Sequence, residues 1–188
     1  MNEDDLNNNL GTIASSGTKK FLAGLSDDQK KDNNLIGQFG VGFYSAFMVA
    51  KRIVVISRKA GEDKAYRWES TGENSYSVEE AERDEQGTTI TLYLNEDSYE
   101  YANRWQIENL IKKYSDHIAY PIYLEYDQTH YEDEKDEEGN AKKTIEHKRE
   151  KINSSSALWR RAKSDITDEE YKSFYKNNYY DSDDPLFY

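Results

Sequence analysis

The sequence contains no cysteine, and this absence excludes a disulfide scaffold, a thiolate metal site and a cysteine nucleophile. No apolar run approaches the roughly 20 residues that a membrane-spanning helix needs. After the initial methionine the chain begins with polar and acidic residues, whereas a secretory signal is basic and then apolar. We therefore expect a soluble cytoplasmic protein that has no membrane partner.

Positive charge is also scarce, because 25 lysines and arginines stand against 37 aspartates and glutamates and leave a net charge of -12. An acidic surface repels the phosphates of nucleic acids, so we expect no DNA or RNA partner. The three histidines are not spaced as zinc ligands, and the acidic run lacks the spacing of a calcium-binding loop. No Gly-x-Ser-x-Gly segment precedes a helix, so neither a metal site nor a serine hydrolase is predicted.

The pattern of apolar residues predicts the order helix, loop, helix, strands, helix and strand. Leu6, Leu10 and Ile13 recur at helical spacing near the start. The stretch 43–50 is apolar on nearly every face and predicts a buried helix, and the β-branched run 53–56 suits a central strand. The other expected elements are a short helix near 21–25, one-sided strands at 66–68 and 90–94, a helix over 107–118 and a strand over 121–124. This mixture favours an α+β architecture with helices on one face of a mixed sheet.

Acidic residues dominate between 125 and 138, and basic residues follow from 142 to 151. Such a segment buries too little apolar surface to offset the entropy of ordering it, so 127–150 is predicted to be a mobile charged linker. Apolar residues return after it, and Thr167-Asp168-Glu169-Glu170 has the pattern of a capping box that starts a helix. The sequence therefore divides into a larger folded part, a linker and a shorter folded part.

Gly37, Gly40 and Gly42 directly precede the apolar stretch and form the sharpest candidate motif. Glycine lets a backbone approach a phosphate without an intervening Cβ, and the amides at a helix N-terminus favour an anion. The spacing is neither that of a P-loop nor that of the dinucleotide fingerprint. Taken alone, the motif fits a phosphate-binding loop and a tight turn into a buried helix equally well.

Five segments of the chain carry more specific motifs. They are 8–14 (NNLGTIA), 16–21 (SGTKKF), 36–45 (IGQFGVGFYS), 113–118 (KYSDHI) and 158–171, which contains LWRR and SDITDEEY. In this order they resemble the heat shock protein 90 family of chaperones, in its bacterial HtpG form. The resemblance runs through nearly the whole chain outside the acidic segment, so it is far more specific than the glycine spacing alone.

The resemblance implies a fold and a division into domains. The implied fold is a two-layer α+β sandwich of the gyrase, histidine-kinase and MutL-like ATPase superfamily, expected to be incomplete here. Residues 1–126 resemble part of an N-terminal ATP-binding domain whose lid is 11–36. Residues 127–150 are the charged linker that the composition predicts, and 151–188 resemble the beginning of a second α/β domain, the middle domain.

The resemblance also implies the residues of a nucleotide site. The loop whose backbone amides bind the phosphates of ATP is similar to Gly37, Gln38, Phe39, Gly40, Val41, Gly42 and Phe43. Asn9 is similar to the asparagine that lines the nucleotide pocket, and Thr88 to the threonine on the adenine side. Mg²⁺ accompanies the nucleotide in the family. Without the resemblance, Asn9 is an ordinary residue of a helix face and Thr88 an ordinary residue of a strand.

By the same resemblance, the whole protein is an ATP-driven, homodimeric chaperone for unfolded or metastable client proteins. The family's catalytic glutamate and its Asp-x-Gly-x-Gly segment for adenine have no counterpart here, and Ser15 stands where relatives often have lysine. We therefore assign no residue a catalytic role, and we expect ATP binding to be weak or absent and hydrolysis to be absent. The alternative is a non-catalytic module that binds a protein partner through exposed aromatic side chains.

Overall fold

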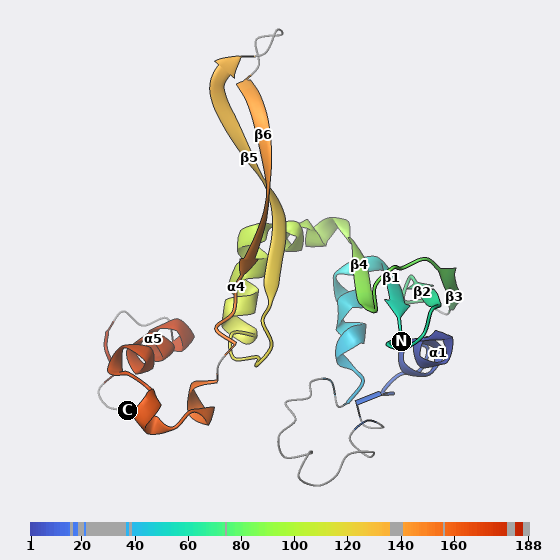
Figure 1. Cartoon of the computed structure of the whole chain (residues 1–188), viewed down its shortest axis with the longest axis horizontal. Coiled ribbons are helices and arrows are strands. Elements are labelled where there is room, and N and C mark those ends of the chain that lie inside the picture. Colours follow the sequence, from blue (N-terminus) through green and yellow to red (C-terminus); the bar gives the residue numbers. More distant parts are fainter. Residues whose placement is uncertain are drawn as a thin grey trace. The chain divides into compact units, whose positions relative to one another are not determined.

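The structure, a computed structural model, describes residues 1–15, 17–18, 21, 37, 39–73, 75–135, 141–155, 157–179 and 183–185. The chain forms two compact units, Met1–Glu100 and Tyr101–Tyr188. Figure 1 labels the main elements of both units. The helix expected near 21–25 and most of the predicted lid at 11–36 lie outside the described residues.

A four-stranded antiparallel sheet forms the centre of the first unit, with its strands in the order β3-β2-β1-β4 (Figure 1). The strands are β1 (Ala50–Arg58), β2 (Ala65–Ser70), β3 (Tyr76–Ala81) and β4 (Gly87–Leu94). Because β1 pairs on both of its edges, the prediction of a central strand at 53–56 is confirmed. Its alternate residues Ile53, Val55 and Ser57 share one face of the sheet, and all three are fully buried.

Two helical segments cover this face of the sheet: α1 (Glu3–Leu10) and the 3-10 helix η1 (Gly42–Met48). Leu6 of α1 is fully buried and joins the sheet residues in one core. The buried members of this core are Leu6, Ala50, Ile53, Val55 and Trp68, and Phe43, Ala46 and Phe47 of η1 pack against them. The unit therefore has a helical layer on one face of an antiparallel sheet, and the predicted α+β class is confirmed.

The helix predicted at 43–50 differs from the expected buried α-helix in two ways. It is a 3-10 helix, and Met48 on it is 81% exposed. The hydroxyl of Ser45 donates to the carbonyl oxygen of Gly42 at 2.6 Å. A side chain that bonds a carbonyl of the preceding turn competes with the α-helical ladder. The apolar pattern therefore predicted a helix correctly but overestimated its burial.

The two edge strands, β3 and β4, both differ from what the sequence predicted. On β4, Ile90 and Leu92 are 51% and 41% exposed, so the predicted burial of one face is wrong. β3 was not predicted, because only Tyr76 and Val78 of its residues are large and apolar. Carboxylates of β3 instead meet cations of β2 and its start: Glu79 lies 2.7 Å from Arg67, and Glu80 lies 2.8 Å from Lys64. These cross-strand pairs make a polar segment compatible with a sheet edge.

The 3-10 helix η2 (Glu96–Ala102) contains the boundary between the two units, and the first helix of the second unit is α4 (Arg104–Tyr114). Asn103 caps α4, because its side chain accepts a hydrogen bond from the Trp105 amide at 2.9 Å. The helix predicted over 107–118 is thus present, but it begins earlier and ends four residues before Ile118.

Two long strands, β5 (Tyr123–Lys135) and β6 (Ala141–Lys151), follow and pair antiparallel as a twisted ribbon (Figure 1). The composition did not predict these strands in the described part of 127–150, whereas the assignment of 127–150 as a mobile charged linker stays a prediction. The ribbon also extends the strand predicted at 121–124. The division into domains at 126/127 and 150/151 stays a prediction.

Opposite charges that face each other explain why this segment forms strands. Glu125 lies 3.1 Å from Arg149 on the opposite strand, and the Asp127 carboxylate lies within hydrogen-bonding distance, 2.9 Å, of His147 Nδ1. Charged neighbours of opposite sign stabilise a strand pair, whereas like charges destabilise it. From composition alone, these charged side chains were expected to prevent ordered structure. In the register of the two strands, they instead form pairs across the ribbon.

The chain continues through the short 3-10 helices η3 (Leu158–Arg160) and η4 (Lys163–Asp165) into α5 (Asp168–Tyr179). The predicted capping box is confirmed. The Thr167 hydroxyl accepts from the Glu170 amide at 3.3 Å, and the Glu170 carboxylate accepts from the Thr167 amide at 2.9 Å. Arg161 pairs with the same carboxylate at 2.6 Å. Together Arg161 and the Thr167 amide lower the pKa of Glu170 from 4.5 to about 2.

We expect the start of α5 to lose stability in acid through Glu170. Because its pKa is lower in the folded than in the unfolded chain, ionised Glu170 stabilises the helix above about pH 4.5. That contribution is lost as the pH falls from about 4.5 to about 2. The ¹³C chemical shift of the Glu170 carboxyl, followed by NMR against pH, measures the midpoint directly. Glu169→Gln should leave the midpoint unchanged, Arg161→Met should raise it, and a wild-type midpoint above pH 4 would contradict the expectation.

Candidate functional site

The glycine loop, residues 37–43, has a backbone that only glycine adopts easily at two positions. Gly37 has φ +84° and Gly40 has φ +66°, both in the left-handed region. A Cβ on Gly40 would meet the Ser15 backbone, with the carbonyl carbon of Ser15 2.6 Å away. Gly40 is therefore required both by its own conformation and by the close approach of Ser15.

Two glycines of the same loop are exposed and have empty space at their Cβ positions. A Cβ built on Gly37 or on Gly42 would have no atom within 4 Å. Phe39 is 80% exposed and Val41 52% exposed. An exposed backbone without side chains at two glycines is what close contact with a phosphate group requires. Gln38, which was predicted to belong to the loop, lies outside the described residues.

Two contacts anchor the end of the loop to the rest of the unit. The Phe43 ring packs edge-on against the Trp68 ring, with 5.5 Å between centroids. The Tyr44 hydroxyl donates to the carbonyl oxygen of Leu10 at 3.0 Å. The sheet and α1 thus both fix where the loop enters η1.

Asn9 lies in the last turn of α1 and is half-buried. The Ser15 hydroxyl donates to its Oδ1 in a long hydrogen bond of 3.5 Å. Ser15 also contacts Gly40 through its backbone. The structure therefore brings Asn9 and the glycine loop to the same place, with Ser15 between them.

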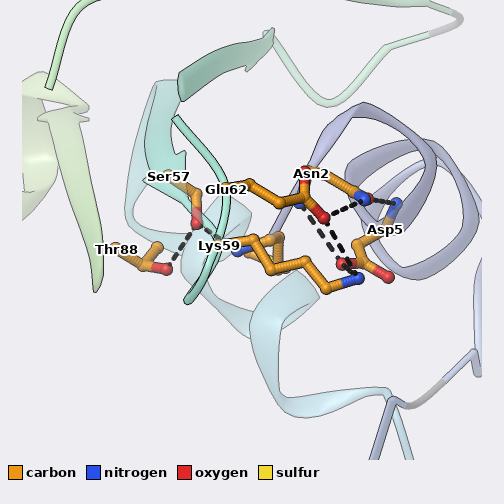
Figure 2. A network of polar contacts seen from close by, with 7 residues as sticks. Asn2, Asp5, Ser57, Lys59, Glu62 and Thr88 are labelled. Atoms are coloured by element: carbon orange, nitrogen blue, oxygen red, sulfur yellow. Dashed lines mark hydrogen bonds and ion pairs between the residues drawn. The ribbon is translucent and has the colours of Figure 1, made fainter. Parts of the chain in front are cut away.

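Thr88 lies at the start of β4, exposed, and its hydroxyl is 2.8 Å from that of the fully buried Ser57 (Figure 2). The α-amino group of Met1 donates to the same Ser57 oxygen at 2.6 Å. Met1 precedes α1 and Asn9 lies in its last turn, and an α-helix of eight residues is about 12 Å long. Thr88 and the glycine loop are thus associated with opposite ends of α1.

A polar network that the sequence did not reveal fixes the start of α1 on the turn after β1 (Figure 2). Lys59 lies 2.9 Å from Asp5 and 3.8 Å from Glu62, and the Asn2 side chain donates to Glu62 at 3.0 Å. Partial burial of Asp5 opposes its ionisation, but the hydrogen bonds from Lys59 and the Asn2 amide outweigh it and lower the pKa of Asp5. The capping box of Asn2 and Asp5 is the one part that local sequence could have indicated.

Other kinds of site find no support in the described part of the chain. No three side chains of His, Asp or Glu gather there as metal ligands. Among the same residues, no helix is both long and apolar enough to cross a membrane. The polar groups that lie together at the glycine loop are its backbone, the Asn9 amide and the Ser15 hydroxyl, and these suit binding by hydrogen bonds.

Comparison with known proteins gives consistent matches along the chain. The family model described as histidine kinase-, DNA gyrase B- and HSP90-like ATPase matches residues 1–99, and the Hsp90 protein model matches 100–148 and 126–188. Over 188 residues the chain is 51% identical to the Chaperone protein HtpG of Borreliella afzelii and to that of Helicobacter pylori. Identity to the Chaperone protein HtpG of Campylobacter jejuni is 54% over the same length. In each case the whole chain is matched, but it spans about 30% of the length of the curated relative.

Proposed function

We propose, from the premise that this chain belongs to the Hsp90 family in its HtpG form, that it binds ATP and serves an ATP-driven chaperone. The observation that carries the proposal is the glycine loop. The space at the Cβ positions of Gly37 and Gly42 is empty, and Ser15 ties the loop to Asn9. Backbone amides that approach an anion closely are a common way to bind phosphate groups.

In this proposal the loop residues, Gln38 among them, bind the phosphates, Asn9 lines the pocket and Thr88 faces the adenine. Mg²⁺ accompanies the nucleotide and offsets the charge of its phosphates. That charge needs an offset because the chain itself carries a net charge of -12. The fit of the loop to phosphate rests on the space in front of Gly37 and Gly42, which any larger residue would fill.

For the whole protein we propose a homodimeric, cytoplasmic chaperone that acts on unfolded or metastable client proteins. Residues 11–36 would close over the nucleotide as a lid, and nucleotide-driven closure would gate the handling of clients. The ATP-binding domain would comprise 1–126, the charged segment 127–150 would connect it to the middle domain, and that domain would begin at 151.

Calorimetric titration of Mg-ATP into the 188-residue chain tests the proposal. Because the family's adenine-binding segment has no counterpart here, we expect weak but saturable heat with a Kd on the order of 1 mM, which corresponds to about 4 kcal/mol. Gly37→Ala should weaken the affinity at least about 10-fold, a loss of about 1.4 kcal/mol, because its methyl group fills the space in front of the loop.

Gly61→Ala is the matched control, since Gly61 in the turn after β1 also has a left-handed φ, +80°, and open space in front of it. Both variants carry the same backbone strain, but only Gly37 belongs to the loop. An equal loss of Mg-ATP affinity in the two variants would show that backbone strain causes the loss, and it would contradict the proposal that the glycine loop binds the phosphates. If the wild-type chain gives no saturable heat, nucleotide binding is overturned and the alternative of a protein-interaction module gains.

A further inference from the structure

Asn153 follows β6 and is a buried amide side chain, only 4% exposed. Its nitrogen donates to the carbonyl oxygens of Ile118 at 3.1 Å and Tyr120 at 2.9 Å. Its oxygen accepts from the Ile122 amide at 2.8 Å and from the Ser155 hydroxyl at 3.1 Å. An asparagine side chain offers two protons and two lone pairs, so Asn153 uses its whole hydrogen-bonding capacity at this place.

The three backbone partners of Asn153 precede the ribbon of β5 and β6, whereas Asn153 itself follows it. Ser154 joins the same two segments. Its amide donates to the Asp116 carboxylate at 2.8 Å, and its hydroxyl donates to the Asp116 carbonyl oxygen at 2.9 Å. Together these hydrogen bonds between 116–122 and 153–155 form a clasp at the base of the ribbon. The chain therefore leaves for the ribbon and returns from it at one place (Figure 1).

The segments on either side of the ribbon also pack on each other beyond the clasp. The His117 ring, just after α4, contacts two rings that follow the ribbon. Its centroid lies 4.7 Å from that of Trp159 in η3 and 5.3 Å from that of Phe174 in α5. The Trp159 and Phe174 rings meet edge-on with 6.1 Å between centroids. Side chains outside the ribbon therefore hold α5 to the end of α4.

We propose that the clasp around Asn153 makes the charged ribbon a side arm, so that its length does not set how α4 and α5 are placed relative to each other. Residues 127–150 still join the proposed domains covalently, but the contacts that hold the flanking segments together bypass them. A flexible tether would behave differently, because the separation of its ends grows with its length. The clasp and its consequence are independent of nucleotide binding.

Double electron–electron resonance on the 188-residue chain tests the proposal, and the absence of cysteine allows spin labels at chosen positions only. Labels on Asn109→Cys in α4 and Ser173→Cys in α5, both exposed, report the distance between the two helices. We expect that replacing 125–149 by a short Asn-Gly turn leaves the mean distance and the width of its distribution unchanged. Asn153→Leu leaves the backbone partners of Asn153 unpaired and should widen the distribution at least about 2-fold, because the clasp then opens locally.

Asn178→Leu is the matched control, because Asn178 is an exposed asparagine of α5 that donates to the Phe174 carbonyl oxygen of its own helix. It should leave the distance distribution unchanged. Asp116→Ala, at a half-buried position, removes the bond to the Ser154 amide and should also widen the distribution. It provides the test of the clasp if Asn153→Leu does not fold.

Two results would overturn the inference. A shifted mean distance or a wider distribution in the chain with the shortened ribbon would show that the ribbon sets the spacing of α4 and α5. An unchanged distribution in the clasp variants that fold would show that the two helices are held without the clasp.

Discussion

Trp68→Ala is expected to lower the free energy of unfolding by about 3–5 kcal/mol, the usual cost of removing a large buried aromatic side chain. Trp68 is 2% exposed in the core of the first unit. Its ring packs edge-on against Phe43, and it stacks on Tyr76 with 5.9 Å between centroids. Alanine would leave a cavity between β1, β3 and η1 that the surrounding backbone cannot fill.

Urea unfolding followed by far-UV circular dichroism measures this change without relying on tryptophan fluorescence. Trp105→Ala is the control, because Trp105 is 66% exposed and its loss should change stability by less than about 0.5 kcal/mol. Trp68→Phe should cost less than Trp68→Ala, since the buried indole N–H has no partner among the described residues. A loss below about 1 kcal/mol for Trp68→Ala would show that the core does not depend on this ring.

Trp68 also connects stability to the candidate site. Phe43 is the last residue of the glycine loop, and its ring lies against Trp68. The core therefore holds one end of the loop, while Tyr44 and Leu10 hold it to α1. Nucleotide affinity in Trp68→Ala should fall together with stability, because the loop loses its contact with the sheet.

The elements that the sequence predicted well are those whose signal is local. In β1 the residues 53–56 form an unbroken β-branched run, and such a run suits a central strand. The capping box at Thr167 and Glu170 needs four adjacent residues and no others. The glycine spacing likewise indicated an open loop, and Gly37 and Gly40 do adopt left-handed conformations.

The elements that the sequence did not predict depend on partners that are distant along the chain. β3 is polar in composition, and its pairing with β2 becomes visible only when Glu79 meets Arg67. The ribbon of β5 and β6 needs Glu125 opposite Arg149, twenty-four positions later. A charge count sums such residues without their register, so it did not predict the strand pair.

The residues of the candidate site also fall into those that a local motif indicated and those that depend on distant partners. Asn9 and the loop glycines were identified through a motif, but Ser57 was not, because its role appears only when β4 places Thr88 beside it. The pairing of Asp5 with Lys59 joins two residues fifty-four positions apart, and no local pattern indicates it. A serine that continues an aliphatic alternation in a central strand was the one available signal, since a buried hydroxyl there must have a partner.

Gly40→Ala is expected to displace the glycine loop from Ser15 and to weaken Mg-ATP binding at least about 10-fold. The substitution places an L-residue at φ +66°, and its Cβ would lie 2.6 Å from the carbonyl carbon and 2.9 Å from the nitrogen of Ser15. Both neighbouring atoms belong to the backbone, so no side-chain rotation relieves the contact. Strain of this kind costs about 1–3 kcal/mol, and the loop can avoid it only by moving away from Ser15.

Amide chemical shifts of Ser15 and Asn9, measured by NMR without nucleotide, report the displacement independently of binding. Gly42→Ala is the matched control, because Gly42 lies two residues further along with open space around its Cβ position and no left-handed φ. We expect Gly42→Ala to leave the Ser15 and Asn9 amides unchanged, so that any loss of affinity there comes from the methyl group alone. Gly40→Ala should instead move both amides, since the contact that ties the loop to α1 is broken. Unchanged amide chemical shifts of Ser15 and Asn9 in Gly40→Ala would mean that the position of the loop does not depend on its contact with Ser15. Asn9 and the glycine loop would then be positioned independently of each other.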